Sequence, residues 1–176
     1  ERYPMLDKAA DNSVFLLNSA LAADEVWQSL PKTMQQQIID KHIKVYCIDA
    51  YRIADVTGMQ KRINTIMQTC FFSISGVLPR DEAINAIKDA VEKTYGRKGK
   101  RLVELNFRAI DETLANLHQV SVPARVSSEI ELPQPVPADA PEFVKRVTGE
   151  IIAGRGDQIP VSLFPVDGTF PLGTAA

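Results

Sequence analysis

Two apolar runs in this sequence end in polar residues whose side chains are suited to binding a ligand. Asn18 and Ser19 follow the run at residues 14–17, and Asp49 follows the run at residues 45–48. If both runs are buried parallel strands, these side chains lie at the carboxyl edge of a sheet, where open α/β sheets bind ligands. Asp49 is at least as well placed to cap the helix that follows it. Ser19 lacks the flanking glycines of a nucleophile elbow, and no complete catalytic set is present.

A second polar set lies within the apolar stretch at residues 60–78. If this stretch is one helix, apolar residues recur on it at a spacing of three and four, and the helix is apolar enough to need enclosure on nearly all sides. Asn64, Gln68 and Ser75 form an uncharged stripe along it. Burying an amide without a hydrogen bond costs about 1–3 kcal/mol. The stripe therefore predicts hydrogen bonds to neighbouring backbone or, alternatively, contact with a domain interface or a ligand.

The remaining residues of nucleophilic or metal-binding type form no site pattern. Cys47 and Cys70, the only two cysteines, lie inside apolar segments and are typical of core thiols in a reducing cytoplasm. His42 and His118 have no cysteine, histidine or carboxylate at ligand spacing, so no metal site is predicted. The sequence also has neither a P-loop nor a GxGxxG motif, which disfavours a Rossmann-type nucleotide binder.

Other polar groupings are expected to be structural. The carboxylate pairs Asp81–Glu82 and Asp111–Glu112 fall on helical patterns and predict solvated helix faces. The triplet at residues 154–156 follows a helical pattern, and its two glycines predict a helix C-cap and a turn.

Composition limits the classes of partner. The 176 residues carry a formal net charge of −2, with 45% hydrophobic and 24% charged residues, as in an ordinary soluble domain. Nucleic acids and anionic membranes bind clustered lysine and arginine, which this chain lacks, so neither is an expected partner. No apolar run reaches the roughly 20 residues that span a bilayer. A cytoplasmic location is therefore expected.

Strand and helix patterns alternate in the first part of the chain. We expect strands at residues 14–17 and 44–48, helices at residues 3–10, 24–30 and 33–41, and a capping box formed by Thr33 and Gln36. This alternation predicts parallel strands joined by right-handed crossovers. Two strands do not make a stable sheet. We therefore expect further strands, upstream of Glu1 rather than in the C-terminal part.

The second part of the chain is predicted to be helical and then extended. A helix beginning at Asp81 and another at about residues 100–119 are expected to form a pair against the sheet layer. Residues 127–141, with alternating prolines, predict an extended arm. A short helix at residues 142–152 and an irregular or edge hairpin at residues 161–170 complete the prediction.

Several strings in this sequence resemble a known enzyme family. They are VFLLNS at residues 14–19, QQIIDK at 36–41, YCIDA at 46–50, RINTIMQTCFF at 62–72, GVLP at 76–79, KTYG at 93–96, KG at 98–99 and PVS at 160–162, with Phe164, DG at 167–168, FP at 170–171 and LGT at 172–174. Together they look like the gamma domain of pyruvate:ferredoxin (flavodoxin) oxidoreductase and the segment after it. The resemblance covers almost the whole chain except residues 124–140, and the stretch at residues 62–79 is its most specific part.

The resemblance implies a fold and a place in a larger protein. The fold is α/β, a helix-rich three-layer α/β/α domain with a small parallel sheet, followed by an extended Pro-rich arm. Residues 1–123 are expected to be the C-terminal part of the gamma domain, and residues 124–176 an extended linker and the start of the next small domain. The other domains of the same polypeptide are the expected partners, and the full enzyme is expected to be a homodimer.

The resemblance also implies a chemistry that this segment does not perform alone. The family decarboxylates pyruvate on thiamine diphosphate, passes electrons through [4Fe–4S] clusters to ferredoxin or flavodoxin, and forms acetyl-CoA. No cofactor is expected to bind within this segment, because it lacks a cluster cysteine set and a diphosphate signature. Asn18, Ser19, Asn64 and Gln68 are expected to face a domain interface or the coenzyme A crevice, with packing as the competing explanation. The alternative function is a free-standing α/β module that binds a partner protein or small ligand without catalysis.

Overall fold

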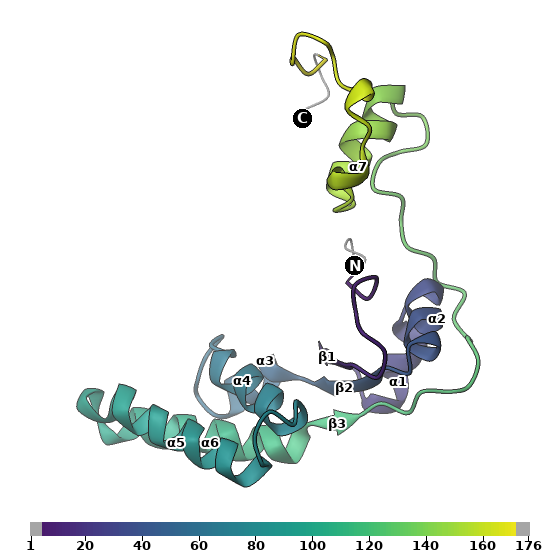
Figure 1. Cartoon of the computed structure of the whole chain (residues 1–176). Coiled ribbons are helices and arrows are strands. Elements are labelled where there is room, and N and C mark those ends of the chain that lie inside the picture. The colour runs from purple at the N-terminus through teal and green to yellow at the C-terminus, as the bar shows by residue number, and fades with distance from the viewer. Residues whose placement is uncertain (1–4, 172–176) are drawn as a thin grey trace.

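A three-stranded sheet lies at the centre of the computed structural model, which describes residues 5–171 (Figure 1). Strand β1 (Val14–Asn18) runs parallel to β2 (Lys44–Ile48), and β3 (His118–Gln119) pairs antiparallel to β2. The α/β class and the two parallel strands are confirmed. The sheet is mixed and not wholly parallel. After the helix that ends at Asn116, the chain forms the two residues of β3, and these pair antiparallel to β2.

Helices cover both faces of the sheet, as expected for three layers. Phe15, Leu17, Val45 and Cys47 pack on one face against α1 (Ala23–Ser29) and α2 (Lys32–Asp40). Leu16 and Ile48 point to the other face and pack with α3 (Ala50–Val56), α4 (Asn64–Ile74) and α6 (Lys100–Asn116). Successive side chains of a strand alternate between faces, so apolar runs without alternation are the pattern of strands covered on both sides.

The helix α2 begins and ends differently from the prediction. It starts at Lys32 after Pro31, whose fixed φ suits a helix start, so Thr33 lies inside the first turn and forms no side-chain cap. The predicted capping box is therefore wrong. At the other end His42 adopts φ +51°, and the N–H groups of His42 and Ile43 donate to the carbonyls of Ile39 and Ile38. This is the Schellman arrangement, with histidine in the position that glycine usually takes.

Helices α5 (Arg80–Tyr95) and α6 form the predicted pair. A 3₁₀ turn, η1 (Gly96–Lys98), joins them, and apolar side chains of both helices share a small core. Lys88 and Asp111 form an ion pair of 2.8 Å across the two surfaces. None of the helices within residues 5–171 is both long and apolar enough to cross a lipid bilayer.

The helix α4 is shorter and less enclosed than the sequence predicts. It spans Asn64–Ile74 and not residues 60–78, and Ile66, Thr69 and Cys70 form its buried side. Phe71 is 52% exposed, and Asn64 and Gln68 lie on the exposed side. The expectation of enclosure on nearly all sides is therefore wrong within the described residues.

The polar residues on the inner side of α4 are Thr65, Thr69 and Ser73, and not the predicted stripe that begins with Asn64 and Gln68. Thr69 and Ser73 donate to the carbonyls four residues before them, and Thr65 donates to Oδ1 of the buried Asn106 on α6. In this way a serine or threonine hydroxyl finds its hydrogen-bond acceptor on its own helix. Asn64 and Gln68 lie on the exposed side of the helix.

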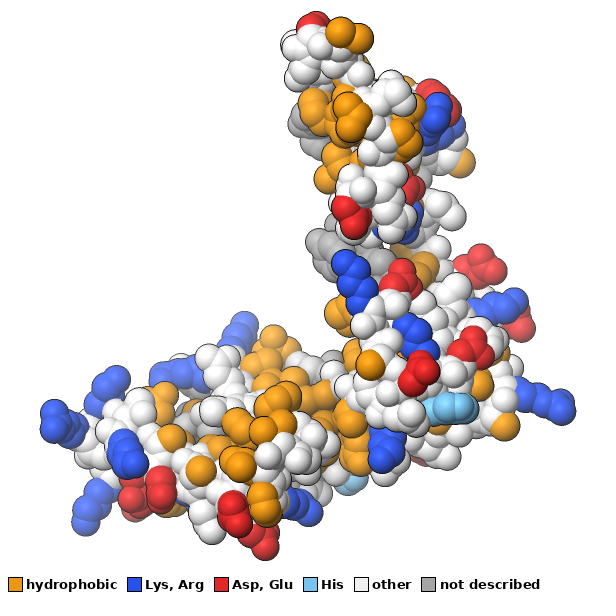
Figure 2. All heavy atoms as spheres, viewed as in Figure 1, with side chains coloured by type: hydrophobic (Ala, Val, Ile, Leu, Met, Phe, Trp, Pro, Cys, Tyr) orange, Lys and Arg blue, Asp and Glu red, His pale blue; other side chains and the backbone are white. Residues whose placement is uncertain are grey.

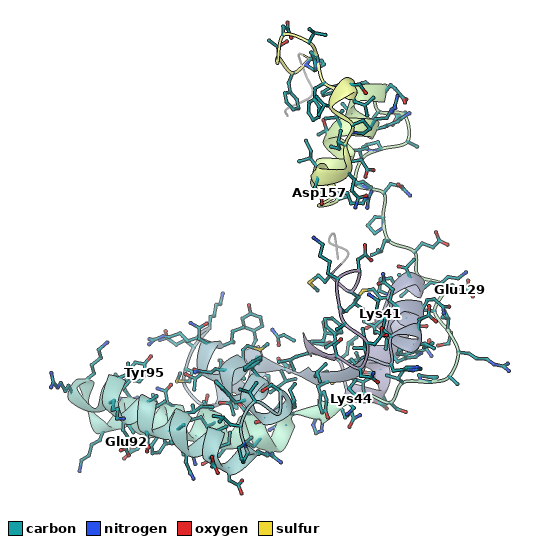
Figure 3. All side chains as sticks on the ribbon, in the orientation of Figure 1. Lys41, Lys44, Glu92, Tyr95, Glu129 and Asp157 are labelled. Carbon is teal, nitrogen blue, oxygen red and sulfur yellow. The ribbon has the colours of Figure 1, made fainter. Side chains whose placement is uncertain are left out.

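The N-terminal segment forms turns and not the predicted helix. Residues 5–8 are turn residues, and Tyr3 and Pro4 lie outside the described part of the chain. Lys41, labelled in Figure 3, holds this segment against α2. Its Nζ donates to the carbonyls of Leu6, Asp7 and Ala9 at 2.6, 2.8 and 3.0 Å. Three carbonyl acceptors satisfy the three donors of one ammonium group.

The Pro-rich segment has no helix or strand between residues 121 and 140, but its beginning is attached to α1 and α2. The buried Gln35 accepts hydrogen bonds through Oε1 from the N–H groups of Ser127 and Ser128 at 2.9 and 3.0 Å. Its Nε2 donates to the carbonyl of Trp27. Residues 127 and 128 therefore lie with the first helical layer, and the proposed domain boundary at residues 123 and 124 stays a prediction.

The C-terminal segment projects away from the sheet (Figure 1). It contains the π-helix η2 (Val144–Thr148), α7 (Gly149–Ile152) and the 3₁₀ turns η3 (Gly156–Gln158) and η4 (Val161–Leu163). Gly154, at φ +75°, ends α7 in a Schellman arrangement, which confirms the predicted cap and turn. The hairpin predicted at residues 161–170 is wrong, because a 3₁₀ turn and bends occupy its described residues.

Candidate functional site

A crevice of 240 Å³ opens at the carboxyl edge of β1 and β2. Residues 20–23 form one wall, and the end of β2 forms its floor; Arg52 of α3, Asn116 of α6 and His118 complete it. Ligands of open α/β sheets bind at this edge because the loops that leave the strands converge there. This crevice is therefore the candidate site of the fold.

Asp49 and Arg52 bring opposite charges to the crevice. Oδ1 of Asp49 accepts the backbone N–H of Arg52 at 2.9 Å and caps α3, so Asp49 both caps the helix and lines the crevice. Nη2 of Arg52 donates to Oδ1 of Asn116 at 2.7 Å, and Nδ2 of Asn116 donates to the carbonyl of Glu112 at 2.8 Å. The guanidinium is thus held in one direction, with further N–H donors to offer.

Asn18 and Ser19 shape the crevice without lining it. Oδ1 of Asn18 accepts the N–H of Ala50 at 2.9 Å, which ties the end of β1 to the start of α3. The N–H of Ser19 donates to the carbonyl of Ile48 at 2.9 Å, and Oγ of Ser19 accepts the N–H of Leu21 at 3.1 Å. These bonds fix the loop at residues 20–23. Both side chains are thus engaged in hydrogen bonds within this chain, and their contact with a domain interface or the coenzyme A crevice stays a prediction.

Asn64 and Gln68 lie on a different surface. They stand one turn apart on the exposed side of α4 and are absent from the residues that line the crevice. Figure 2 shows hydrophobic side chains gathered over α4 and the loop that follows it; its most exposed large members are Phe71, Val77 and Leu78. The structure thus does not bring the four residues predicted from the sequence into one site.

The cysteines do not fit an iron–sulfur cluster. Cys47 packs in the core on the α1 and α2 face of the sheet, and Cys70 packs in the core on the opposite face. Burial raises the pKa of the Cys47 thiol, and it raises the pKa of Cys70 to about 12. A cluster needs four converging thiolates, whereas these two thiols are separated by the sheet and stay protonated.

The charged residues also do not fit the metal that accompanies a bound diphosphate. Within residues 5–171 no group of three or more His, Cys, Asp and Glu side chains converges. Figure 3 shows Glu92 near the far end of α5 and Asp157 in the projecting C-terminal segment. Neither a cluster site nor a diphosphate-bound metal site is therefore formed by the residues that the structure describes.

Sequence reasoning identified the edge but missed three of its residues. Asp49 was predictable from its place after a strand. Arg52 lies three residues later, in the first turn of α3, and this spacing was a usable signal. Asn116 and His118 come from the end of α6 and the start of β3, and only the fold of the later helices places them at the crevice.

Comparison with known proteins identifies two matching family models. The model described as "Pyruvate ferredoxin/flavodoxin oxidoreductase" matches residues 1–115. A model named EKR, described as a domain of unknown function, matches residues 129–176. The two matches leave residues 116–128 between them, which include β3 and the residues bound by Gln35.

Relatives match nearly the whole chain. The pyruvate-flavodoxin oxidoreductase of Rhodospirillum rubrum is 50% identical over 175 residues, 99% of this chain. That of a Nostoc species is 46% identical over 182 residues, also 99% of this chain. The pyruvate:ferredoxin oxidoreductase of Moorella thermoacetica is 43% identical over 173 residues, 98% of this chain. In each case the match spans only 15% of the relative's length.

Proposed function

This chain belongs to the pyruvate ferredoxin/flavodoxin oxidoreductase family, and from that premise we propose that it is one segment of a longer enzyme. The enzyme oxidatively decarboxylates pyruvate, forms acetyl-CoA and transfers the electrons to ferredoxin or flavodoxin. The observation that carries the proposal is the identity over nearly the whole chain to relatives named for that activity. The segment alone is expected to be inactive.

The cofactors of this activity belong to other parts of the longer polypeptide. The proposal assigns thiamine diphosphate, the [4Fe–4S] clusters and coenzyme A to the whole enzyme, which is cytoplasmic and a homodimer. It is supported by the placement of Cys47 and Cys70 in separate cores, which leaves this chain no cluster ligands. Residues 1–123 are the C-terminal part of its gamma domain, and residues 124–176 are the linker and the start of the next small domain.

The role of this segment is structural and interdomain. Asn64 and Gln68 are exposed amides next to the exposed ring of Phe71, a combination that suits contact with another domain. Asn18 and Ser19 hold the loop that forms one wall of the crevice. In the longer enzyme Asn64 and Gln68 donate hydrogen bonds on a face toward the coenzyme A crevice, while Asn18 and Ser19, on a different surface of this chain, fix the wall of the crevice at the strand ends.

The test of this role uses the full-length enzyme. Asn64→Ala and Gln68→Ala are each expected to raise KM for coenzyme A about threefold to tenfold, because each removes a hydrogen bond worth about 0.5–1.5 kcal/mol. Thiamine content should stay unchanged. Asn85→Ala, which removes an exposed amide from α5, is the matched control and should leave KM unchanged. A lower Tm with unchanged KM would assign Asn64 and Gln68 a purely structural role.

The test of the activity itself is the reduction of ferredoxin or flavodoxin by the full-length polypeptide. Reduction should require both pyruvate and coenzyme A. The alternative is a free-standing α/β module that binds a small ligand, and the crevice lined by Arg52 and His118 is the observation that favours it. A reading frame extending on both sides of this sequence, with cluster cysteines downstream, supports the enzyme; a frame limited to these residues supports the module.

A further inference from the structure

The turn that joins α5 to α6 collects positive charge at one end of the molecule. Five exposed cations lie there: Lys93 near the end of α5, Arg97 and Lys98 in η1, and Lys100 and Arg101 at the start of α6. Figure 2 shows blue side chains around this end of the helical pair, which lies far from the sheet in Figure 1. These five residues are named the basic tip.

The basic tip differs in charge from the rest of the chain. Residues 92–104 contain its five cations and only two carboxylates, those of Glu92 and Glu104, so this stretch has a net charge of +3. The whole chain has a net charge of −2, so the remainder carries −5. The basic tip is therefore a local positive surface on an otherwise acidic molecule, and such a surface attracts an anionic partner.

No carboxylate within residues 5–171 forms an ion pair with the basic tip. The ion pairs of this part of the chain involve Lys88, Arg146 and Arg155 instead. Nζ of Lys98 lies 5.6 Å from the centroid of the Tyr95 ring, a contact that leaves its charge in place. The five charges are thus available to another molecule.

Helix stability does not account for the two cations that begin α6. The N-terminus is the positive end of a helix dipole, where carboxylates are stabilising and cations are not. Helix α6 begins with Lys100 and Arg101 and has no acidic residue in its first turn, whereas α5 has Asp81 and Glu82 in its first turn. A local preference that is broken without a local gain indicates a role outside the helix.

The surroundings of the basic tip favour a protein partner that binds transiently. No large hydrophobic side chain is exposed between residues 79 and 129, all of which the structure describes. The tip therefore lacks the apolar centre of a permanent interface and the apolar side chains that insert into a membrane. Tyr95 is half-buried beside Lys98, so it is poorly placed to stack on a nucleic-acid base.

We propose that the basic tip binds the acidic surface of a separate protein in a transient complex. Clustered Asp and Glu side chains of the partner face the five cations, and complementary charge directs the encounter. Helices α5 and α6 have 16 and 17 residues, so they extend the tip about 24 Å along their axes. This partner site goes beyond the function proposed above and does not depend on the reaction of the longer polypeptide.

Binding of fluorescein-labelled poly-L-glutamate to the full-length polypeptide tests the charge of this surface. A fourfold variant replaces cations of the tip with glutamate: Arg97→Glu, Lys98→Glu, Lys100→Glu and Arg101→Glu. It should bind poly-L-glutamate about tenfold or more weakly at about 50 mM salt, and the difference should shrink as salt is added. The Tm should stay the same or rise, because glutamate suits the start of α6.

The matched control reverses the same number of charges on other surfaces. It replaces four exposed cations outside the tip: Lys8→Glu, Lys32→Glu, Lys44→Glu and Arg125→Glu. This control should bind poly-L-glutamate within about threefold of the wild type. An equal loss of binding in the two variants would show a response to net charge alone and would overturn the proposal. If the reversed tip lowers the Tm, the same four positions changed to glutamine decide the question, and an unchanged affinity in that variant overturns it.

Other polyanions separate the classes of partner. A single-stranded oligonucleotide and vesicles that contain anionic lipid are compared with poly-L-glutamate at equal charge, and neither should bind more tightly through the basic tip. Tighter binding of either one that is lost in the tip variant would assign the surface to a nucleic acid or a membrane and overturn the proposal.

Lysine acetylation followed by mass spectrometry shows whether the full-length polypeptide leaves the tip free. Lys98 and Lys100 should react within about threefold of their rates in the urea-unfolded polypeptide. Lys88, whose Nζ lies 2.8 Å from Oδ1 of Asp111, is the internal control and should react more slowly. Slow reaction at Lys98 and Lys100 would show that another part of the polypeptide covers the tip and would overturn a separate partner. Oxidation of pyruvate is measured independently and decides only the proposed function.

Discussion

Cys70 combines complete burial with an ionisable thiol, and this gives stability a specific pH dependence. Its pKa is raised from an ordinary 9.0 to about 12 by burial. In the unfolded chain the thiol ionises near pH 9, whereas in the folded chain it stays neutral. The contribution of this difference is therefore fully present below pH 9 and is lost as the pH rises from 9 toward 12, at about 1.4 kcal/mol per pH unit.

Urea unfolding at pH 8 and pH 10.5 measures this effect. The wild-type chain should lose more free energy of unfolding over this interval than Cys70→Ala, because the variant lacks the titrating group. All other ionisable groups are the same in the two proteins, so the comparison isolates Cys70. Equal losses in the two proteins would show that the thiol of Cys70 is accessible to water in the folded state.

At the level of single residues, the sequence predicted the roles of helix-capping residues better than the positions of amide side chains. Asp49 and Gly154 lie next to helix ends, and local spacing is enough to predict what their backbone neighbours need. Whether the side chains of Asn64 and Gln68 are buried or exposed depends on which side of α4 faces α6. Apolar residues occur around most of that helix, so periodicity alone did not determine its buried side.

Among the elements, the buried Gln35 is a main attachment of the extended arm to α2, beside the bond from the N–H of Lys32 to the carbonyl of Ile130 at 2.8 Å. Gln35→Met keeps the volume but leaves the N–H groups of Ser127 and Ser128 without their acceptor, whereas the carbonyl of Trp27 keeps the N–H of Leu30 as a donor. An unsatisfied buried group costs about 1–3 kcal/mol, so the free energy of unfolding should fall by about 2 kcal/mol or more. The tryptophan fluorescence should change as well, because Nε1 of Trp27 donates to Oγ of Ser127.

The adjacent Gln36 provides the control for this prediction. Its Nε2 donates to Asp40 at the surface, so Gln36→Met should change the free energy of unfolding by less than about 0.5 kcal/mol. Urea unfolding followed by fluorescence measures both variants. A similar small effect of Gln35→Met would show that Ser127 and Ser128 are not held by this side chain in solution.

The elements themselves were largely predictable, and their ends were less so. Strand β2 has the predicted bounds because its apolar run is closed by Asp49. Helix α4 ends four residues before the predicted end, because Gly76, at φ +68°, breaks the helix before Pro79 does. Strand β3 was not predicted, since two residues carry no periodicity and pair only because α6 delivers them beside β2.

For the whole molecule, the exposed apolar surface of α4 predicts self-association of the isolated chain. Phe71 of α4 is 52% exposed, and Val77 and Leu78 in the loop that follows α4 are 66% and 42% exposed. Exposed apolar patches promote contact between molecules unless another surface covers them. Phe71→Ser should therefore lower the apparent mass of the isolated chain in sedimentation at a given concentration, with little change in Tm.

The neighbouring ring gives the matched control. Phe72 packs against the core shared by α5 and α6, so Phe72→Ser should lower the Tm instead. If Phe71→Ser leaves the apparent mass unchanged while the wild-type chain self-associates, the contact lies elsewhere on the molecule.

The attachment of residues 127 and 128 to Gln35 also has a mechanical consequence. The projecting C-terminal segment leaves the main body after residues 127–130, which are bonded to α2 through Gln35 and the N–H of Lys32, and not from the last strand of the sheet. A small rotation of α2 would move that point of departure directly. The far end of the C-terminal segment would then move farther than α2 itself, because it lies far from the point of attachment.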